Sequence, residues 1–196
     1  MDNSQITYIT TCKGRLHHLK QSLPSVVAQP NIKVIVVDYD CPDGTGEWVR
    51  ANFPSVQVVK VSNAPFFQLS HARNVGARVA TARWLAFFDA DVILPNGFFA
   101  RMSRMLTPGA FFLAKTEAAN LWGSVIVERE AFVKAGEYDE AITHWGGEDI
   151  ALYNDLRFLG YAMQTYDAPD TKAIEHGDDE RVRFSRVRDM TRAKQL

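Results

Sequence analysis

The stretch Trp84-Leu85-Ala86-Phe87-Phe88-Asp89-Ala90-Asp91 joins an apolar run to two carboxylates that lie two residues apart. The run has the length and composition of a buried strand, so Asp89 and Asp91 should project from its carboxyl end. Open α/β sheets bind ligands at that end of their strands. Carboxylate oxygens there suit Mg²⁺ or Mn²⁺ better than a soft metal, and such a cation could be held against a diphosphate. Because Asp-x-Asp also occurs as a simple turn cap, it indicates a metal site only together with the rest of the chain.

Apolar runs rich in β-branched residues alternate with helical patterns along the first half of the chain. Strand-like runs lie at 6–11, 33–38 and 56–61, and amphipathic stretches follow them. In the second half a strand is expected at 124–127, and a further helix should begin near Glu148. This alternation predicts an α/β fold in which a mostly parallel central sheet is flanked by helices.

The composition favours one domain that acts on a small molecule or a saccharide. With 196 residues, of which 46% are hydrophobic, the chain can bury a full core. The net charge of -1 provides no general attraction to nucleic acid, so we expect no nucleic-acid partner. No apolar run reaches the roughly 20 residues of a membrane-spanning helix, and the N-terminus lacks the pattern of a signal peptide. These features predict a cytoplasmic location.

The two cysteines, Cys12 and Cys41, each follow a predicted strand at the same edge of the sheet, so they could lie close together. A chain without an export signal usually keeps its cysteines as free thiols. We expect free thiols here, and the sequence leaves their pairing open.

A second cluster of chemically active residues is Trp145-Gly146-Gly147-Glu148-Asp149. Paired glycines let the backbone approach a ligand closely, and acids at the start of a helix are favoured by the helix dipole. A carboxylate in this position could act as a general base on a hydroxyl. The alternative is that Glu148 or Asp149 only caps the helix, but a cap needs neither the glycines nor the aromatic ring.

Six short motifs follow one another along nearly the whole chain. They are Thr10-Thr11-Cys12-Lys13-Gly14-Arg15, Val37-Asp38-Tyr39-Asp40 with Asp43-Gly44-Thr45, Ala72-Arg73-Asn74-Val75-Gly76, Asp89-Ala90-Asp91, Gly136-Glu137-Tyr138-Asp139-Glu140 and Trp145-Gly146-Gly147-Glu148-Asp149. In this order the chain resembles GT-A glycosyltransferases of the family 2 type, and its second half is similar to galactosyl- and N-acetylgalactosaminyltransferases. It departs from that pattern at Tyr39 and at Cys41-Pro42, where relatives commonly carry a second Asp and a Ser.

The resemblance implies one GT-A domain over residues 1–176. Its nucleotide-binding half would span 1–92, and its acceptor and catalytic half 93–176. Residues 177–196 would form a flexible basic tail, in which six Arg and Lys residues alternate with acids. Three interpretations of this tail stay open: a solvated or disordered segment, an active-site flap, and a peripheral membrane contact.

The resemblance also implies a role for each matching residue. Asp91 and His176 would bind the cation, Mn²⁺ or Mg²⁺. Asp149 would act as the general base, while Glu148 would bind a sugar hydroxyl. Asp38 would accept a hydrogen bond from N3 of uracil, where cytosine has no proton to donate. The residues implied in nucleotide-sugar binding are Thr10, Arg15, Asp38, Asp40, His71, Arg73, Asp89, Trp145 and Gly147.

These inferences predict a metal-dependent, inverting glycosyltransferase that moves a hexose from a UDP-sugar to a saccharide or glycoconjugate acceptor, as in polysaccharide biosynthesis. Galactose or N-acetylgalactosamine is favoured only because of the Trp-Gly-Gly-Glu-Asp motif. A nucleotidyltransferase stays open as an alternative, although it would want a glycine- and lysine-rich phosphate loop after the first strand. A catalytically silent sugar- or nucleotide-binding subunit is the other alternative, although a binder needs no base. The sequence does not determine the acceptor, the linkage or the oligomeric state.

Overall fold

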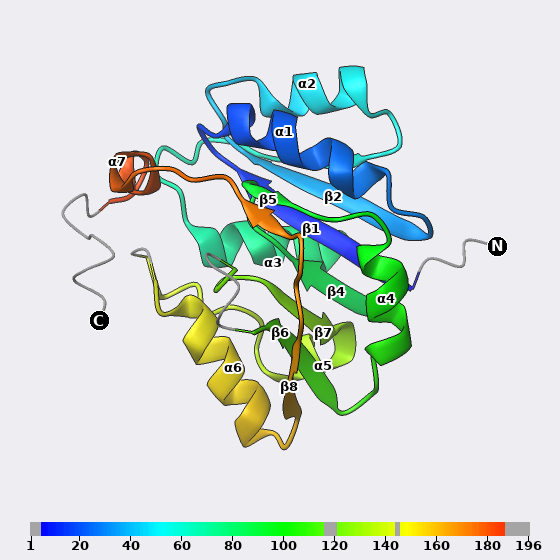
Figure 1. The fold of residues 1–196 in the computed structure, drawn as a ribbon. Helices are drawn as coiled ribbons and strands as arrows, with labels where there is room; N and C mark the ends of the chain where they lie inside the picture. Colours follow the sequence, from blue (N-terminus) through cyan, green and yellow to red (C-terminus); the bar gives the residue numbers. More distant parts are fainter. Residues whose placement is uncertain (1–4, 116–120, 144–145, 187–196) are drawn as a thin grey trace.

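The computed structural model describes residues 5–115, 121–143 and 146–186, and it shows a central sheet covered by helices on both faces (Figure 1). The strands are β1 (Ile6–Cys12), β2 (Ile32–Tyr39), β3 (Gln57–Val61), β4 (Trp84–Phe87), β5 (Val92–Ile93), β6 (Ala110–Ala114), β7 (Val125–Glu128), β8 (Ala162–Tyr166) and β9 (Lys172–Ala173). The helices are α1 (Leu16–Val27), α2 (Thr45–Asn52), α3 (Leu69–Val79), α4 (Phe98–Met105), α5 (Arg129–Lys134), α6 (Glu148–Phe158) and α7 (Asp178–Val182).

The main sheet has seven strands in the order β3-β2-β1-β4-β7-β6-β8. Strands β3, β2, β1 and β4 are parallel, β7 is antiparallel to β4 and β6, and β8 is parallel to β6. The strand order reverses between β1 and β4, so the carboxyl ends of these two strands meet where α/β sheets bind ligands. The predicted fold class is therefore confirmed, and the strand expected at 33–38 is observed at Ile32–Tyr39.

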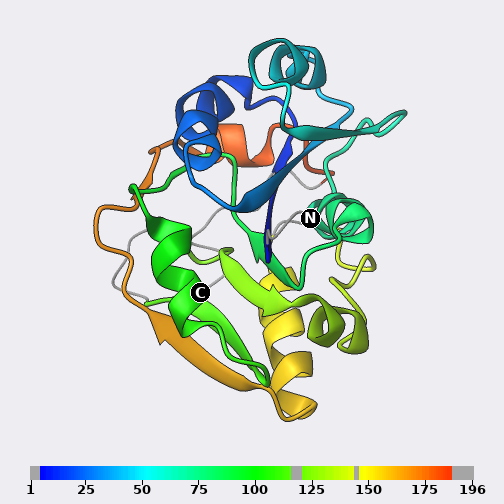
Figure 2. The same ribbon diagram turned by 90° about the vertical axis from the view of Figure 1, so that its right-hand side faces the viewer.

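Alternate side chains of the strands enter two apolar cores, one on each face of the main sheet. On β1, Ile6 and Tyr8 belong to the core that α1 and α4 cover, whereas Ile9 belongs to the core on the side of α3 and α5. Figure 2 shows these two pairs of helices on opposite sides of the sheet. A Cβ on Gly76 would lie only 2.6 Å from Cγ2 of Ile9, so glycine at this position lets α3 lie directly against β1.

A second, two-stranded sheet brings a late segment of the chain to the end of β4. Strand β5 pairs antiparallel with β9, and the N–H of Ile174 donates a 2.8 Å hydrogen bond to the carbonyl of Asp91. His176 follows two residues later and therefore lies beside Asp91, 85 positions away in the sequence.

The described part of the predicted tail packs on the N-terminal half of the molecule. In α7, Glu180 lies 3.5 Å from both His17 and His18 of α1. The carbonyl of Phe184 accepts a 2.8 Å hydrogen bond from the loop before α3. The rest of the tail, 187–196, lies outside the described residues, so the mobility of the tail stays a prediction. Among the helices that the structure describes, none is long and apolar enough to cross a membrane.

Cys12 and Cys41 are free thiols that share one hydrogen-bonded network. The sulfur of Cys41 accepts 3.1 Å hydrogen bonds from the N–H of Gly14 and from the hydroxyl of Thr45. The pKa of Cys41 is lowered to about 6, mainly by a hydrogen bond from the thiol of Cys12 and to a smaller extent by those from Thr45 and Gly14. Burial of Cys41 acts in the opposite direction.

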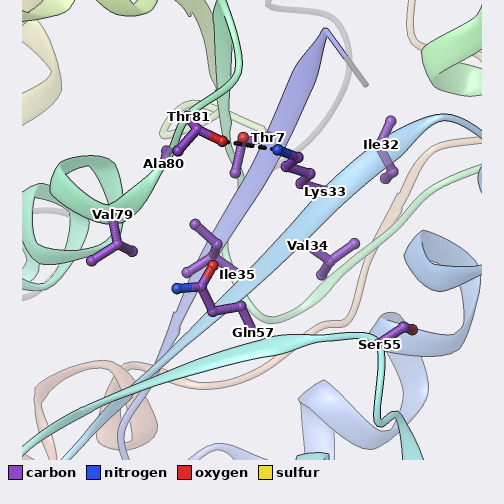
Figure 3. Close-up of a pocket in the computed structure, with 10 residues that line it drawn as sticks. All are labelled: Thr7, Ile32, Lys33, Val34, Ile35, Ser55, Gln57, Val79, Ala80 and Thr81. Carbon is purple, nitrogen blue, oxygen red and sulfur yellow. Dashed lines mark hydrogen bonds between the residues drawn. The ribbon is translucent and has the colours of Figure 1, made fainter. Parts of the chain in front are cut away.

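A surface pocket of about 420 Å³ lies at the opposite, amino-terminal end of the strands (Figure 3). It is lined by Thr7, Ile32, Lys33, Val34, Ile35, Ser55, Gln57, Val79, Ala80 and Thr81. Lys33 is the one titratable residue in this lining, and its Nζ donates a 2.9 Å hydrogen bond to the hydroxyl of Thr81 (Figure 3). The pocket is therefore separate from the acidic groups at the carboxyl ends of the strands.

Candidate functional site

The two carboxylates that follow β4 have different partners. Asp89 accepts a 2.9 Å hydrogen bond from Nη2 of Arg73 on α3. Asp91 lies with its Oδ2 2.9 Å from Nε2 of His176, which the pairing of β5 with β9 brings alongside. The Asp-x-Asp sequence therefore contributes one residue to each of two neighbouring parts of the site.

Arg73 holds the first part together. Its guanidinium donates hydrogen bonds of 2.6 Å to Asp149, 2.9 Å to Asp89 and 3.0 Å to the carbonyl of Gly123, and it lies over the ring of Tyr138 at 5.0 Å. We call these five residues the arginine cluster. The side chain is only 2% exposed, and the planar guanidinium is suited to binding several acceptors at once. Arg73 therefore joins the predicted nucleotide half, through Asp89, to the start of α6, through Asp149.

Asp149, at the start of α6, is a buried carboxyl group with a raised pKa. Burial raises the pKa of Asp149 to about 7; Arg73 opposes this shift, whereas the neighbouring charges of Glu148 and Asp89 add to it. A carboxyl group with a pKa near neutrality can accept a proton at working pH, as general-base catalysis requires. The N-cap of α6 is Gly147, and among the described residues no side-chain hydrogen bond caps this helix end. Asp149 is the second residue of the helix and does not occupy the N-cap position, and its role as a base stays a prediction.

Asp91 and His176 form the second part, which we call the histidine pair. Their side chains are 11% and 5% exposed, and Nη1 of Arg15 lies 3.2 Å from Nε2 of His176. Burial acts to raise the pKa of Asp91, but the hydrogen bond from His176 and the charge of Arg15 outweigh it, so the pKa lies below its usual value. An ionised carboxylate and an imidazole nitrogen directed at each other fit a divalent cation such as Mn²⁺. The structure thus brings the two predicted metal ligands together.

The residues predicted to bind the nucleotide lie at the carboxyl ends of β1 and β2. Asp38 is buried, and its two oxygens accept 2.9 Å hydrogen bonds from the N–H groups of Cys41 and Gly46, which fixes the loop before α2. Asp40 has a side chain that is 41% exposed and accepts a hydrogen bond from the loop after β3. Thr10 is buried within β1. The contact of Asp38 with uracil stays a prediction.

The other predicted contacts come from α3 and the start of α6. His71 lies with Nδ1 2.8 Å from the hydroxyl of Tyr39. Gly147 has φ 95°, a backbone conformation that favours glycine. Glu148 is 4% exposed, and its Oε2 has no hydrogen-bond partner among the described residues, so it suits a ligand hydroxyl. Trp145 lies outside the described residues, and its contact with a sugar stays a prediction.

Sequence reasoning assigned no role to three groups that the structure places in or beside the site. The ring of Tyr138 and the carbonyl of Gly123 belong to the arginine cluster. Lys13 is buried, and its Nζ donates hydrogen bonds of 2.7 to 3.2 Å to carbonyls at the end of β2 and in the loop after β3. Tyr138 and Lys13 each belong to one of the six sequence motifs described above, and this membership was the only sequence feature that could have indicated a role for them. A backbone carbonyl such as that of Gly123 has no sequence signature.

Arg73 is bound by groups of the protein itself. The family resemblance implies that Arg73 binds the nucleotide-sugar, and the structure shows the guanidinium bound to protein carboxylates in a buried position. A direct contact with the nucleotide stays a prediction. The observed contacts make Arg73 a residue that positions Asp89 and Asp149.

Comparisons with known proteins identify the family and the fold of the chain. A family model described as glycosyl transferase family 2 matches residues 7–118, which is more than half of the chain. A second, described as the N-terminal domain of galactosyltransferase, matches residues 110–177. A search of curated proteins finds no match to the chain.

Solved structures of glycosyltransferases share the fold. A mannosyltransferase from Pyrobaculum calidifontis, PcManGT in complex with GDP-Man and Mn²⁺, matches with a TM-score of 0.74 and 17% identity over 92% of this chain and 61% of its own. Residues 1–349 of S. aureus TarS match with a TM-score of 0.74 and 13% identity, over 97% of this chain and 68% of theirs. The complex of this TarS fragment with UDP-GlcNAc has a TM-score of 0.68 and 13% identity, over 97% of this chain and 69% of its own.

The chain thus spans about three-fifths of the length of the mannosyltransferase. At these identities the solved structures establish the GT-A fold alone. The match over residues 7–118 goes further, because it covers more than half of the chain, including both carboxylates after β4 and residues 7–92 of the predicted nucleotide half. The chain belongs to glycosyl transferase family 2.

Proposed function

We propose that this protein is a metal-dependent, inverting glycosyltransferase that moves a hexose from a UDP-sugar to a hydroxyl of a saccharide or glycoconjugate. Membership of family 2 supports glycosyl transfer. The solved relatives with UDP-GlcNAc and with Mn²⁺ support a nucleotide-sugar donor and a divalent cation. The match of the second half to a galactosyltransferase domain supports galactose or N-acetylgalactosamine as the hexose.

On the donor side, the nucleotide would lie over the carboxyl ends of β1 and β2. Asp38 would accept a hydrogen bond from the base on a lone pair that its contacts with Cys41 and Gly46 leave free, and the more exposed carboxylate of Asp40 would lie beside the ribose. Arg15, beside His176, places a guanidinium where it could form charge-assisted hydrogen bonds with a diphosphate. Asp89, held by Arg73, would face the ribose.

The histidine pair would hold the cation. When bound by Asp91 and His176, a divalent cation supplies electrostatic stabilisation for the negative charge that develops on the leaving diphosphate. The low pKa of Asp91 keeps its carboxylate ionised and ready to act as a ligand at neutral pH.

On the acceptor side, Asp149 would remove the proton from the attacking hydroxyl. Arg73 binds Oδ1 of Asp149, so Oδ2 would take the proton while the carboxylate stays oriented. The hydroxyl oxygen then forms a bond to the anomeric carbon as the bond from that carbon to the diphosphate breaks on the opposite face. This displacement gives inversion through an oxocarbenium-like state. The unpartnered Oε2 of Glu148 would accept a hydrogen bond from a sugar hydroxyl.

The observation that carries the proposal is the placement of Asp149, with its pKa of about 7, on the same buried arginine as Asp89. A donor screen tests it directly. UDP- and GDP-hexoses are incubated with saccharide acceptors, in Mn²⁺ or in EDTA, and release of the nucleoside diphosphate is measured. We expect release from a UDP-hexose only with Mn²⁺. A preference for GDP-sugars would overturn the donor assignment, and release in EDTA would overturn the metal requirement.

A further inference from the structure

A cluster of metal-binding side chains lies outside the site described above, between α1 and α7. It consists of His17, His18 and Glu180, and the potential ligand atoms of the three all lie within 4.8 Å of one another. Nε2 of His17 and Nε2 of His18 are each 3.5 Å from the same carboxylate oxygen, Oε2 of Glu180. The geometry points to a second cation site here, with three protein ligands, for a first-row transition metal of the Zn²⁺ type.

The distances in this cluster are those between ligands of one metal ion rather than those of hydrogen bonds. An N–H group that donates to a carboxylate normally lies about 2.7 to 3.2 Å from it. Two ligands of a tetrahedral Zn²⁺ lie roughly 3.3 Å apart, because each bond is about 2.0 to 2.2 Å long. Both separations of 3.5 Å are closer to the second arrangement.

Burial provides an independent indication of a missing partner. The side chain of His18 is 4% exposed, and Oε2 of Glu180 is buried without a hydrogen-bond partner among the described residues. A carboxylate oxygen that loses water without gaining a partner is costly, so native structures rarely leave one. A cation between Glu180 and the two imidazoles would satisfy that oxygen.

The ligand types predict which metal each site prefers. Two imidazoles and one carboxylate favour Zn²⁺ or Co²⁺, whereas the histidine pair has one imidazole fewer for its one carboxylate and so is less selective for these metals over Mn²⁺. The two sites are neighbours, because the ring of His18 lies 5.3 Å from the ring of His176. His176 itself is directed at Asp91, so the proposed site uses none of the histidine pair.

Metal binding at this site would fix the C-terminal segment against α1. The ring of Phe184, just beyond α7, lies so close to Gly14 that a Cβ on Gly14 would be 2.0 Å from it. The amino group of Lys13 lies 5.2 Å from the centre of the same ring. A cation bound by Glu180 would therefore hold the segment from α7 to Phe184 on the loop that follows β1. This cation would stabilise the packing of the C-terminal segment whether or not substrate is bound.

Titration of the whole chain with Co²⁺ tests the site, since tetrahedral Co²⁺ reports its ligands by visible absorption and Zn²⁺ then displaces it. The titration uses the Asp91→Asn variant, in which the histidine pair is disabled. We expect one Co²⁺ per chain. Adding Glu180→Gln or His17→Gln should weaken its binding at least about tenfold. His17 is 55% exposed, so its replacement tests the site without disturbing the core.

Asp179→Asn is the matched control, because Asp179 is an exposed acid of α7 next to Glu180. It should leave Co²⁺ affinity unchanged. Hydrogen exchange gives a second measurement: Zn²⁺ should slow exchange in residues 178–182 of the Asp91→Asn protein and should not do so after Glu180→Gln. The proposal is overturned if Asp91→Asn binds no Co²⁺, or if Glu180→Gln binds it as tightly as its parent. An adventitious surface ion would give the second result.

Discussion

Replacing Arg73 by glutamine should move the pH dependence of transfer to higher pH. The guanidinium lies 2.6 Å from Asp149 and opposes the effect of burial, which leaves the pKa of Asp149 at about 7. Loss of an opposite charge at this range raises a carboxyl pKa by about 1 to 3 units. The pKa in Arg73→Gln should therefore be about 8 to 10. At pH 7 the ionised fraction would fall from about one half to between about 0.1 and 0.001, which predicts a loss of transfer of about 5- to 500-fold.

The lost activity should return as the pH rises, because the base is intact and only its proton affinity has changed. The assay measures nucleoside diphosphate release between pH 6 and 10 with saturating donor and Mn²⁺. Arg78→Gln is the matched control, since Arg78 lies on the same helix, is 52% exposed and binds only surface acids among the described residues. Its profile should match that of the unmodified protein. An Arg73→Gln profile with an unchanged midpoint would refute this reasoning.

Stability gives a second measurement on the same variant. A carboxyl group whose pKa is raised in the folded state contributes stability below its unfolded pKa, about 3.9, and loses it as the pH rises toward the folded value. Raising the folded pKa of Asp149 from about 7 by a further 1 to 3 units should therefore add a destabilisation of Arg73→Gln that is close to zero at pH 6 and about 1 to 3 kcal/mol at pH 9, beyond the pH-independent cost of the lost hydrogen bonds. Urea unfolding of Arg73→Gln and of the unmodified protein at pH 6 and at pH 9 measures this pH-dependent difference in stability. Arg73→Lys keeps the positive charge, so both the shift of the pH profile and the loss of stability at high pH should be smaller than in Arg73→Gln.

The remaining predictions concern the cation, the fold and the tail. Calorimetry should show that Asp91→Ala weakens the binding of UDP in the presence of Mn²⁺ far more than the control Glu47→Ala, on the exposed face of α2. If the unmodified protein bound UDP equally well in EDTA and in Mn²⁺, the metal assignment would be contradicted. Gly76→Ala places a Cβ 2.6 Å from Ile9. The cost of overpacking, about 1 to 3 kcal/mol, should exceed the gain in helix propensity of about 1 kcal/mol, so the variant should unfold at a lower urea concentration. A higher unfolding midpoint would argue against the close packing of α3 on β1. Hydrogen exchange in residues 177–186 should slow when UDP and Mn²⁺ are added, and unchanged exchange would leave the flap interpretation without support.

The main sheet was predictable because its strands carry their own signal. β1, β2 and β4 are apolar runs bounded by turn residues, and each is observed within two residues of its expected limits. The two-residue strands β5 and β9 carry no such pattern, since periodicity needs several residues to be detected. Local pattern alone therefore could not place His176 beside Asp91, and the family resemblance supplied that expectation.

The arginine cluster shows what residue-by-residue reasoning misses. A basic residue on an amphipathic helix is usually solvated, and nothing near Arg73 in the sequence indicates that two distant acids and a carbonyl bury it. The same holds for His17 and His18, which gained a shared partner only when α7 packed against α1. Contacts of this kind depend on tertiary packing, which sequence periodicity does not report.

The Asp149→Asn variant provides the most direct test of the account. Asparagine keeps the shape and can still accept a hydrogen bond from Arg73, but it cannot take a proton from the acceptor. We predict that transfer falls by about 10²-fold or more while UDP affinity, measured by calorimetry, stays within a few-fold. Asp155→Asn, at an exposed position of the same helix, should leave both values unchanged. Near-normal turnover in Asp149→Asn would contradict the assignment of Asp149 as the base and would transfer that role to Glu148.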